Sequence, residues 1–381
     1  MRVRSHTWTA AFGWSAPLGA HETTANLVLS FGPLDAPGAE WFASIKAHCP
    51  AALHVYVSGG GQIAGGMVDD DVTVVSFLAF DATTVHPIVL DHATVEKSAT
   101  LGAQLGASLR EIPGVRHVLL FAEGITFIAD AFLNALNPFL PSTVKVSGGL
   151  ASNGTALTHS AVGVDAPPVA GRIVALALTG ESLVVGTGSV GGWDFFGPER
   201  IVTRATTAVV HELDGERALD VYKRYLGEFA SELPGIALLF PLAVRVTRDS
   251  PVGVRTIIAV DEATGSMRFA GDIPQGSIVR LMRTTTDQLT DGAARAARIA
   301  REDVSETLGD SFTLCISCIG RRAVMRSRVE EEIDEVQRES GSAVVVGFYS
   351  NGEIAPPTDG RDFGEAVLHN QTMTVTTIAE R

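Results

Sequence analysis

The chain has 381 residues, of which 46% are apolar and 19% charged, so it is long enough for two domains with buried cores. Its formal net charge of −14 argues against a surface for nucleic acid or anionic lipid, because both depend on clustered Lys and Arg. Three cysteines give no disulfide framework, and no apolar run approaches the roughly 20 residues that span a bilayer. The N-terminus lacks the uninterrupted apolar segment of a signal peptide. We expect a cytoplasmic globular protein.

Three segments share the order strand, helix, strand at similar spacing, which indicates an internal repeat. The predicted elements are 26–32, 37–49 and 53–63 in the first unit, 117–124, 127–140 and 143–149 in the second, and 313–322, 325–340 and 342–348 in the third. A crossover helix makes the two strands of each unit parallel. A further strand follows each unit, at 72–80, 172–180 and 368–380, and extra helices precede the second and third units, at 95–112 and 285–309.

The chain between the second and third units is predicted to be rich in strands and turns. Turn signals lie at 180–182, 262–265 and 274–276, and one helix is expected at 216–233. The acidic turn HELDGE just before that helix is the predicted boundary, which gives domains at 22–213 and 214–381. The predicted fold class is α/β, with two domains, internal strand–helix–strand repeats, mixed sheets flanked by helices and a β-rich middle segment.

Polar, glycine-rich loops follow the second strand of each unit: VSGGGQI, GLASNGT and GFYSNGEI. Strand ends are common ligand sites in α/β sheets, and Asn and Gly tolerate the left-handed backbone that turns N–H groups toward an anion. The predicted ligand-lining residues are Tyr349, Ser350, Asn351, Glu353, Ser152, Asn153 and Gln62. The alternative is a type I′ hairpin turn, although Pro356 and Pro357 follow too soon for a strand to pair straight back. Only the third loop has a carboxylate, since the equivalent positions are Thr155 and Gln62.

Arg321 and Arg322 follow an apolar strand, where one of them could clamp a ligand carboxylate through two parallel hydrogen bonds. The alternative is a structural role, either as a helix cap or in an ion pair with Glu330 or Glu353.

Signatures of catalysis and of structural metal binding are weak. There is neither a G-x-S-x-G nucleophile motif nor a phosphate-binding P-loop. Cys315 and Cys318 form a CxxC pair inside a predicted strand, which places them on opposite faces and favours packed thiols over zinc ligands.

Several motifs, taken in order, resemble the FIST family of bacterial and archaeal sensory proteins, which have an N-terminal and a C-terminal FIST domain. They are the segment 192–222, CIGRR at 318–322, GFYSNGEI at 347–354 and LHNQT at 368–372. The first loop departs from the family pattern, because Gln62 replaces the usual Glu and Val57 replaces a Cys.

The resemblance implies sensing of a small ligand rather than catalysis. Amino acids are among the ligands proposed for the family, and some relatives are described as haemoproteins that sense nitric oxide. His369 and Asn370 open the predicted last strand, so His369 is a candidate ligand-binding residue and the candidate for haem iron, although no CxxCH attachment motif is present.

We expect a small amino acid, carboxylate or amine to bind in a cleft between repeat units or domains, without a cofactor. Alternatives are a haem-binding nitric-oxide sensor and, less favoured, a hydrolase that uses Glu, His and Arg for acid–base chemistry. No kinase, cyclase or methyl-accepting segment follows Arg381. A separate signalling protein, such as a kinase, cyclase or chemoreceptor, is therefore the expected partner, and neither nucleic acid nor membrane is.

Overall fold

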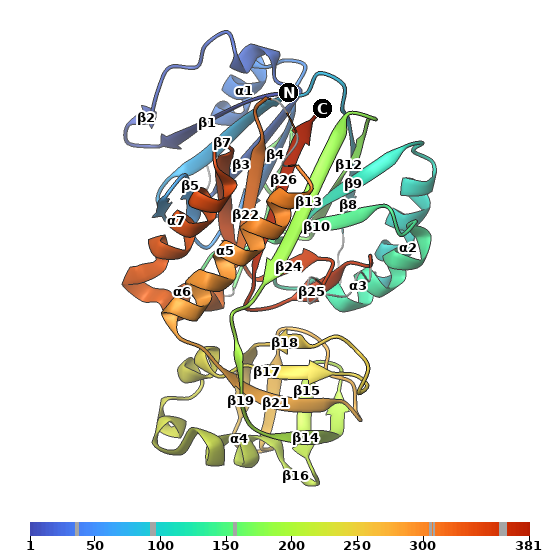
Figure 1. The fold of residues 1–381 in the computed structure, drawn as a ribbon, viewed down its shortest axis with the longest axis vertical. Coiled ribbons are helices and arrows are strands. Elements are labelled where there is room, and N and C mark those ends of the chain that lie inside the picture. Colours follow the sequence, from blue (N-terminus) through green and yellow to red (C-terminus); the bar gives the residue numbers. More distant parts are fainter. Residues whose placement is uncertain (35–37, 92–96, 155–157, 305–306, 308, 358–363) are drawn as a thin grey trace.

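The computed structural model describes residues 1–34, 38–91, 97–154, 158–304, 307, 309–357 and 364–381. It has a larger α/β body and a smaller β-rich body, which lie one above the other in Figure 1. The β-rich body comprises residues 194–283, and the larger one, called the three-repeat body below, comprises the chain before and after it. The mixed α/β fold class predicted from the sequence is confirmed.

The three-repeat body contains three six-stranded sheets. Sheet 1 has, in spatial order, β11 (Val162–Val164), β4 (Leu53–Ser58), β3 (Leu27–Gly32), β7 (Thr73–Ala79), β1 (Arg2–Thr9) and β2 (Gly13–Trp14). Sheet 2 has β25 (Val367–His369), β24 (Gly352–Ala355), β10 (Lys145–Leu150), β9 (Val115–Ala122), β12 (Arg172–Thr179) and β8 (Thr84–Asp91). Sheet 3 has β13 (Leu183–Val190), β26 (Met373–Glu380), β22 (Phe312–Cys318), β23 (Val344–Ser350), β5 (Gln62–Ala64) and β6 (Met67–Asp69).

Each sheet is built around one repeat unit with the same four-strand order. The central parallel pair is β3 with β4, β9 with β10 and β22 with β23, so the predicted parallel pairing is confirmed in all three units. A third strand (β7, β12 or β26) runs antiparallel to the first member of the pair, and a fourth (β1, β8 or β13) runs antiparallel to the third.

The remaining inner strands are exchanged between units in a ring. β5 leaves unit 1 and pairs with β23 of unit 3, β24 leaves unit 3 and pairs with β10 of unit 2, and β11 leaves unit 2 and pairs with β4 of unit 1. Every exchanged strand is antiparallel to the strand that it covers. The three residue pairs of each pairing tie the three sheets into a closed body with an approximate threefold arrangement.

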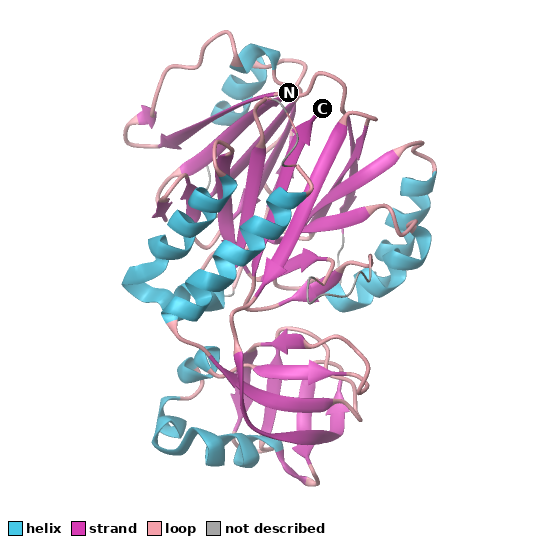
Figure 2. Ribbon diagram, in the orientation of Figure 1, coloured by secondary structure: helices cyan, strands magenta, loops and turns pink. Residues whose placement is uncertain are grey.

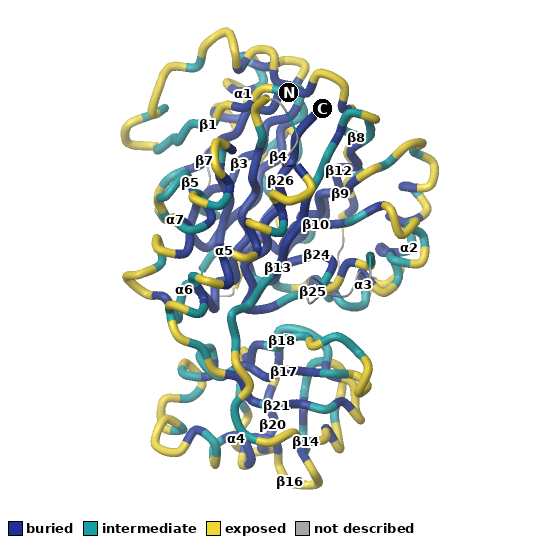
Figure 3. The backbone as a smooth tube through the Cα atoms, in the orientation of Figure 1, coloured by how far each residue is buried: buried dark blue, intermediate teal, exposed yellow. Residues whose placement is uncertain are grey.

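The inner faces of the three sheets share one core, to which Leu29, Leu119 and Leu314 contribute from the three units. The central strands of the three sheets are accordingly mostly dark blue in Figure 3, because both of their faces are covered. This explains why their sequences are apolar without strict alternation.

Helices cover the outer faces of the sheets (Figure 2). Sheet 1 is covered by α1 (Ala39–His48), sheet 2 by α2 (Ser98–Arg110) and α3 (Ala129–Leu136), and sheet 3 by α5 (Thr286–Glu302) and α7 (Val329–Ser340). The short helix α6 (Ile319–Met325) follows β22 directly. Helix α5 begins with a capping box of Thr285 and Gln288, which satisfies N–H groups of its first turn.

The β-rich body has one sheet of eight strands and one α-helix. Its strands are β14 (Asp194–Thr206), β15 (Val209–Leu213), β16 (Glu216–Arg217), β17 (Leu242–Arg245), β18 (Gly253–Arg255), β19 (Ile257–Asp261), β20 (Ser266–Phe269) and β21 (Ile278–Arg283), and its helix is α4 (Ala218–Leu226). Short 3-10 helices lie at 227–232 and 235–239 in the β-rich body, and at 22–24, 137–139 and 326–328 in the three-repeat body. The β-rich body has a core of its own around Val202, Tyr222 and Phe269.

The domain boundary predicted between residues 213 and 214 lies in the turn between β15 and β16, which pair with each other inside the β-rich body. Two local expectations change in the structure. His369 and Asn370 do not open the last strand: His369 ends the edge strand β25, and β26 begins at Met373. Arg321 and Arg322 lie within α6, because the chain turns into a helix directly after β22. In the described part of the chain, no helix is long and apolar enough to cross a bilayer.

The close approach of α5 to sheet 3 gives a prediction about stability. A Cβ atom on Gly186 or Gly188 would overlap the backbone carbonyl oxygen of Ala300 or Ala296 in α5. We expect Gly186→Ala to lower the free energy of unfolding by about 1 to 3 kcal/mol, because the helix must move away from the sheet. Gly235→Ala is the control, since its Cβ would meet nothing within 4 Å. Equal midpoints for both variants in urea denaturation would contradict this packing.

Candidate functional site

The three glycine-rich loops meet at one end of the three-repeat body. Each loop donates a backbone N–H to a carbonyl of another unit: Gly60 to Tyr349 at 2.8 Å, Ser152 to Ser58 at 2.8 Å and Asn351 to Leu150 at 3.2 Å. These bonds run in the same cyclic direction as the exchanged strands. The loops are therefore turns within a ring of units, and none forms the simple hairpin considered as the alternative reading. Thr155 lies outside the described residues.

Asn351 is held by neighbours on both sides of its amide. The Ser152 hydroxyl donates to Asn351 Oδ1 at 2.7 Å, and Asn351 Nδ2 donates to the carbonyl of Gly124 at 3.4 Å. These contacts join the loops of units 2 and 3 to the end of β9. They fix the orientation of the Asn351 side chain, which lines a cleft.

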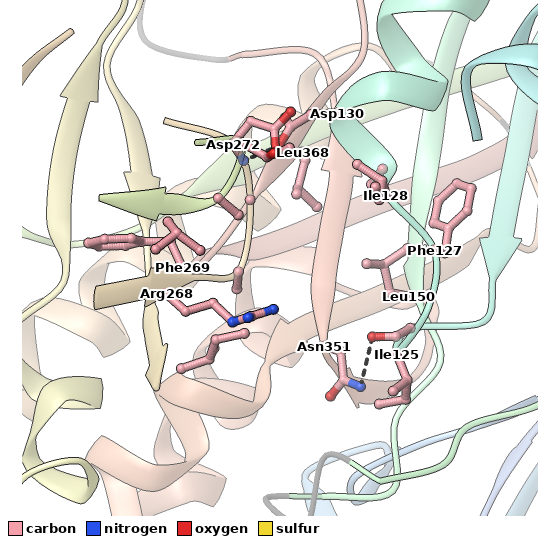
Figure 4. A pocket seen from close by; sticks show the side chains of 18 of the residues that line it. Ile125, Phe127, Ile128, Asp130, Leu150, Arg268, Phe269, Asp272, Asn351 and Leu368 are labelled. Atoms are coloured by element: carbon pink, nitrogen blue, oxygen red, sulfur yellow. Dashed lines mark hydrogen bonds between the residues drawn. The ribbon is translucent and has the colours of Figure 1, made fainter. Parts of the chain in front are cut away.

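This cleft lies between the two bodies and has a volume of about 690 Å³. The three-repeat body contributes the segment 124–130, Leu150, Asn351 and Leu368, and the β-rich body contributes 206–209, His211, Ile258 and 268–272. Figure 4 shows how these two groups face each other. The walls are mainly apolar with a few polar groups, which is the usual composition of a small-molecule site.

Arg268 supplies the cation of the cleft. It lies on β20 between the buried side chains of Met267 and Phe269, so strand alternation turns it away from the core of the β-rich body. Figure 4 shows its guanidinium extending toward the wall that carries Asn351. Its side chain has no hydrogen-bond or ion-pair partner in the described part of the chain. Its donors are thus available to an anionic ligand.

A second charged group stands beside Leu368 in the cleft, where Asp272 faces Asp130 (Figure 4). Burial raises the pKa of Asp272, and the carboxylate of Asp130 raises it further, against the opposing effect of Arg255. Asp130 is itself paired with Arg255, at 2.9 Å. The cleft therefore presents an unpaired guanidinium on β20 and a destabilised carboxylate on the loop that follows it.

Glu353, singled out from the sequence, is 0% exposed and does not line the cleft. Its Oε1 accepts from the Ser350 hydroxyl at 2.6 Å, and its Oε2 accepts from the N–H and hydroxyl of Thr372, at 3.2 and 3.0 Å. Burial raises its pKa to about 7 despite these donors. Gln62 is also buried, and its Nε2 donates to the Gly59 carbonyl. Both side chains contact the loops from inside the body.

Arg321 and Tyr349 belong to a buried network. Arg321 pairs with Glu332 at 2.6 Å, and both side chains are 0% exposed. Glu332 also accepts from Tyr349 and from Ser317. The structural ion pair was the alternative reading for Arg321, but its partner is Glu332, rather than Glu330 or Glu353, because α7 lies across β22 and β23.

Arg322 points elsewhere and lines a second cavity, of about 660 Å³, together with Asn153 and Gly60. It makes two hydrogen bonds to the exposed carboxylate of Asp70 and a third to the Gly60 carbonyl. Of the sequence-predicted residues, Asn351 thus lines the cleft between the bodies, and Asn153 and Arg322 line the second cavity.

His369 and Asn370 lie where the two bodies touch. Asn370 is buried, and its Oδ1 accepts from the N–H of Thr256 in the β-rich body, at 3.3 Å. His369 Nε2 lies 3.1 Å from the carbonyl of Ala355, so this nitrogen carries the proton. Iron could bind Nε2 only after that bond breaks. A haem role for His369 stays a prediction.

Two hydrogen-bonded Ser–His pairs resemble the Ser–His pairs found in hydrolase active sites. Ser30 bonds His54, and Ser147 bonds His117, each at 2.8 Å. All four side chains are buried and line neither cavity. Burial lowers the pKa of His54 to about 4 and that of His117 to about 3, so both rings stay neutral. These pairs stabilise the parallel strand pairs of units 1 and 2.

The three cysteines are free and buried. Burial raises the pKa of Cys49 to about 11 and those of Cys315 and Cys318 further still. They are packed thiols, as the sequence indicates.

Sequence reasoning missed Arg268, Asp130 and Asp272. The alternation in Ser266–Phe269 would have shown that Arg268 faces away from its own core. Nothing local shows what it faces instead, because the opposite wall comes from a distant part of the chain.

The geometry defines a two-body α/β protein with a cleft between the bodies. The family model of the FIST N domain matches residues 26–216, and that of the FIST C domain matches residues 218–356. The chain belongs to the FIST family.

Among curated proteins, the chain is 25% identical over 265 residues to uncharacterized proteins of Mycobacterium tuberculosis strains CDC 1551 and H37Rv. The match covers 67% of this chain and 66% of each relative's length. A cyanuric acid hydrolase structure aligns over 100% of this chain and 99% of its own, with a TM-score of 0.36 and 9% identity. The cyanuric acid hydrolase of A. caulinodans covers 78% of this chain and 99% of its own, with a TM-score of 0.19 and 11% identity. These values are too low to transfer an activity.

The Arg321–Glu332 pair predicts a large loss of stability when one partner is removed. We expect Arg321→Gln to lower the free energy of unfolding by about 3 to 5 kcal/mol, because Glu332 keeps a buried charge without a cation. Arg172→Gln is the matched control: Arg172 pairs with Asp91, whose side chain is 61% exposed, and its loss should cost under about 1 kcal/mol. Similar urea midpoints for the two variants would contradict the role of the buried pair.

Glu353 predicts a specific dependence of stability on pH. The pKa of Glu353 is higher in the folded chain than in the unfolded chain, where it has the ordinary value of 4.5. The resulting stabilisation is full below pH 4.5 and is lost as pH rises through about 7, a change on the order of 3 kcal/mol. Glu353→Gln should remove this component, since the amide can accept from Thr372 and donate to Ser350. Urea denaturation between pH 4 and 8 tests this; parallel curves for the two proteins would refute it.

Proposed function

We propose that this protein is a ligand-binding sensory protein that holds a small carboxylate-bearing molecule, of the amino acid class, in the cleft between its two bodies. The observation that supports this most is the guanidinium of Arg268, which extends into the cleft without a protein partner (Figure 4). Arg268 is exposed and has no partner among the described residues, so its guanidinium is free to bind a ligand carboxylate through two parallel hydrogen bonds.

The rest of the cleft matches the other parts of such a molecule. Leu150, Ile128 and Leu368 offer an apolar wall to a hydrocarbon side chain. The carboxylate of Asp272, whose pKa is raised, would be stabilised by a ligand ammonium group. An amino acid could therefore place its two charges and its side chain against three different parts of the cleft.

A ligand in this position would contact both bodies, which is how its presence would be transmitted. A molecule that binds one arrangement of the bodies better than another shifts the population toward that arrangement. We propose that a separate signalling protein, such as a kinase, cyclase or chemoreceptor, responds to the shift.

The proposal predicts that Arg268→Gln weakens ligand binding by about 10- to 100-fold, the effect of losing one charged hydrogen-bonded contact. The measurement is a thermal-shift panel of L-amino acids, the matching amines without a carboxylate and the matching acids without an amine. Binding to the folded state raises the melting temperature, so the panel also shows which charge is required.

Arg204→Gln is the matched control, because Arg204 lies on β14 of the same body, pairs with Glu212 and does not line the cleft. The proposal fails if no compound stabilises the protein at concentrations far above a plausible dissociation constant. It also fails if a binder stabilises the Arg268→Gln and Arg204→Gln variants equally.

A further inference from the structure

The two bodies are connected by two linkers that lie side by side. The chain leaves the three-repeat body at Gly191–Trp193 and returns at Thr284–Thr285, and the Thr284 hydroxyl donates to the Gly192 carbonyl at 2.6 Å. Figure 1 shows both linkers crossing together below α5 and α6. Two adjacent linkers hold the bodies together at one place. Other contacts must restrain rotation of one body relative to the other about that place.

Arg321 fastens the attachment to the three-repeat body. Besides its bond to Glu332, its guanidinium donates to the carbonyl of Gly191 at 2.5 Å and to that of Leu289 at 2.8 Å. It thus contacts the outgoing linker and the first turns of the returning helix α5. Because the Arg321–Glu332 pair is wholly buried, the position of both linkers is fixed relative to α6 and α7.

A second set of contacts joins the bodies on the side of α3. Arg255 of β18 donates to Asp130 Oδ1 at 2.9 Å and to the Leu368 carbonyl at 3.1 Å. The backbone N–H of Asp272 donates to Asp130 Oδ2 at 2.9 Å. Both carboxylate oxygens of Asp130 therefore accept from the β-rich body. Only 12% of the Arg255 side chain and 14% of the Asp130 side chain are exposed.

Gly271 makes this close approach possible. A Cβ atom at this position would lie 2.7 Å from Arg255 Nε and 2.9 Å from Asp130 Oδ2, which is closer than real Cβ contacts. A larger residue would force the side chains of Arg255 and Asp130 to shift, and would thereby disturb the contact between them. The contact thus depends on shape as well as on charge, and two different substitutions can disrupt it.

The contact forms part of the cleft itself, because Asp130, Gly271 and Asp272 all line it. When Arg255 and Asp130 separate, the β-rich wall moves away from the α3 wall. The linkers on the opposite side then act as the axis of that movement. The Arg255–Asp130 ion pair thus lies at one edge of the cleft, and the two linkers lie opposite. In this arrangement the linkers can act as a hinge, and the ion pair can hold the bodies together.

We propose that Arg255, Asp130 and Gly271 form a latch that holds the β-rich body closed over the cleft, and that opening of this latch about the paired linkers admits and releases the ligand. Its role in ligand exchange rests on the proposed function, whereas its role in holding the bodies together does not. A ligand that contacts both walls binds the latched arrangement more tightly, and by linkage the latch and the ligand stabilise each other.

The latch is tested without ligand by double electron–electron resonance between spin labels at Gln104→Cys in α2 and Glu228→Cys in the β-rich body. Both positions are exposed, and the three native cysteines are buried. We expect one narrow distance distribution for the parent protein. Arg255→Gln and Gly271→Ala should each broaden it or shift it to a second distance, because both disrupt the same contact.

Arg172→Gln is the matched control, since it removes an Arg–Asp pair within sheet 2, away from the joint between the bodies. An unchanged distribution in Arg255→Gln or in Gly271→Ala overturns the latch, and so does equal broadening in Arg172→Gln. Circular dichroism confirms that each variant is folded. Should Arg255→Gln fail to fold, Arg255→Lys, which keeps the charge but not the geometry of the guanidinium, takes its place under the same criteria.

Any compound that stabilises the parent protein in the thermal-shift panel provides the second readout. Arg255→Gln should weaken its binding by about fivefold or more, although Arg255 does not line the cleft. Unchanged affinity overturns the coupling of latch and ligand. Because the distance measurement uses no ligand, failure of the panel refutes the proposed function and leaves the latch standing, whereas unchanged distances refute the latch alone.

Discussion

The architecture depends on the pairing of three short exchanged strands. A single repeat unit would leave the edge of its parallel pair open, and an open edge is a site for unwanted association. Here β5, β24 and β11 each cover the edge of another unit, so that no unit is complete without the other two. The same exchange brings the three loops to one end of the body. The ends of the three repeats therefore form one surface, and the β-rich body lies against it.

Polar side chains divide into two groups with different roles. Glu353, Arg321 and Ser350 are buried, and each is hydrogen-bonded within the three-repeat body. Such networks hold the loops in one arrangement, because a buried polar group that loses its partner costs free energy. Arg268 and Asp272 stand in the cleft instead, and their chemistry remains available to a ligand. In the proposed function, the repeats would supply a platform for the ligand, and the inserted body would supply the charges that recognise it.

The predictions that succeeded concern local pattern. Apolar runs separated by helices of crossover length identified the three units and their parallel strands. The role of Asn351 in ligand binding stays a prediction. The predictions that changed concern where a side chain points, into the core or into the cleft. Glu353 follows the same loop as Asn351, but its strand crosses into sheet 2 and carries it into the interior. Arg268 lay in a segment that contained only strand and turn signals, and the wall opposite it comes from distant parts of the chain on both sides of it in sequence.

By itself, the sequence determined the three repeat units and the parallel strand pair in each, because these follow from periodicity and turn chemistry along the chain, and its motifs indicated the family. The tertiary structure alone decided that the units exchange strands, that the middle segment forms a separate body, and that Arg268, Asp272 and Asn351 share one cleft. The physical reason is that burial and charge pairing depend on the surfaces that meet. The two walls of this cleft come from segments that are far apart in the sequence.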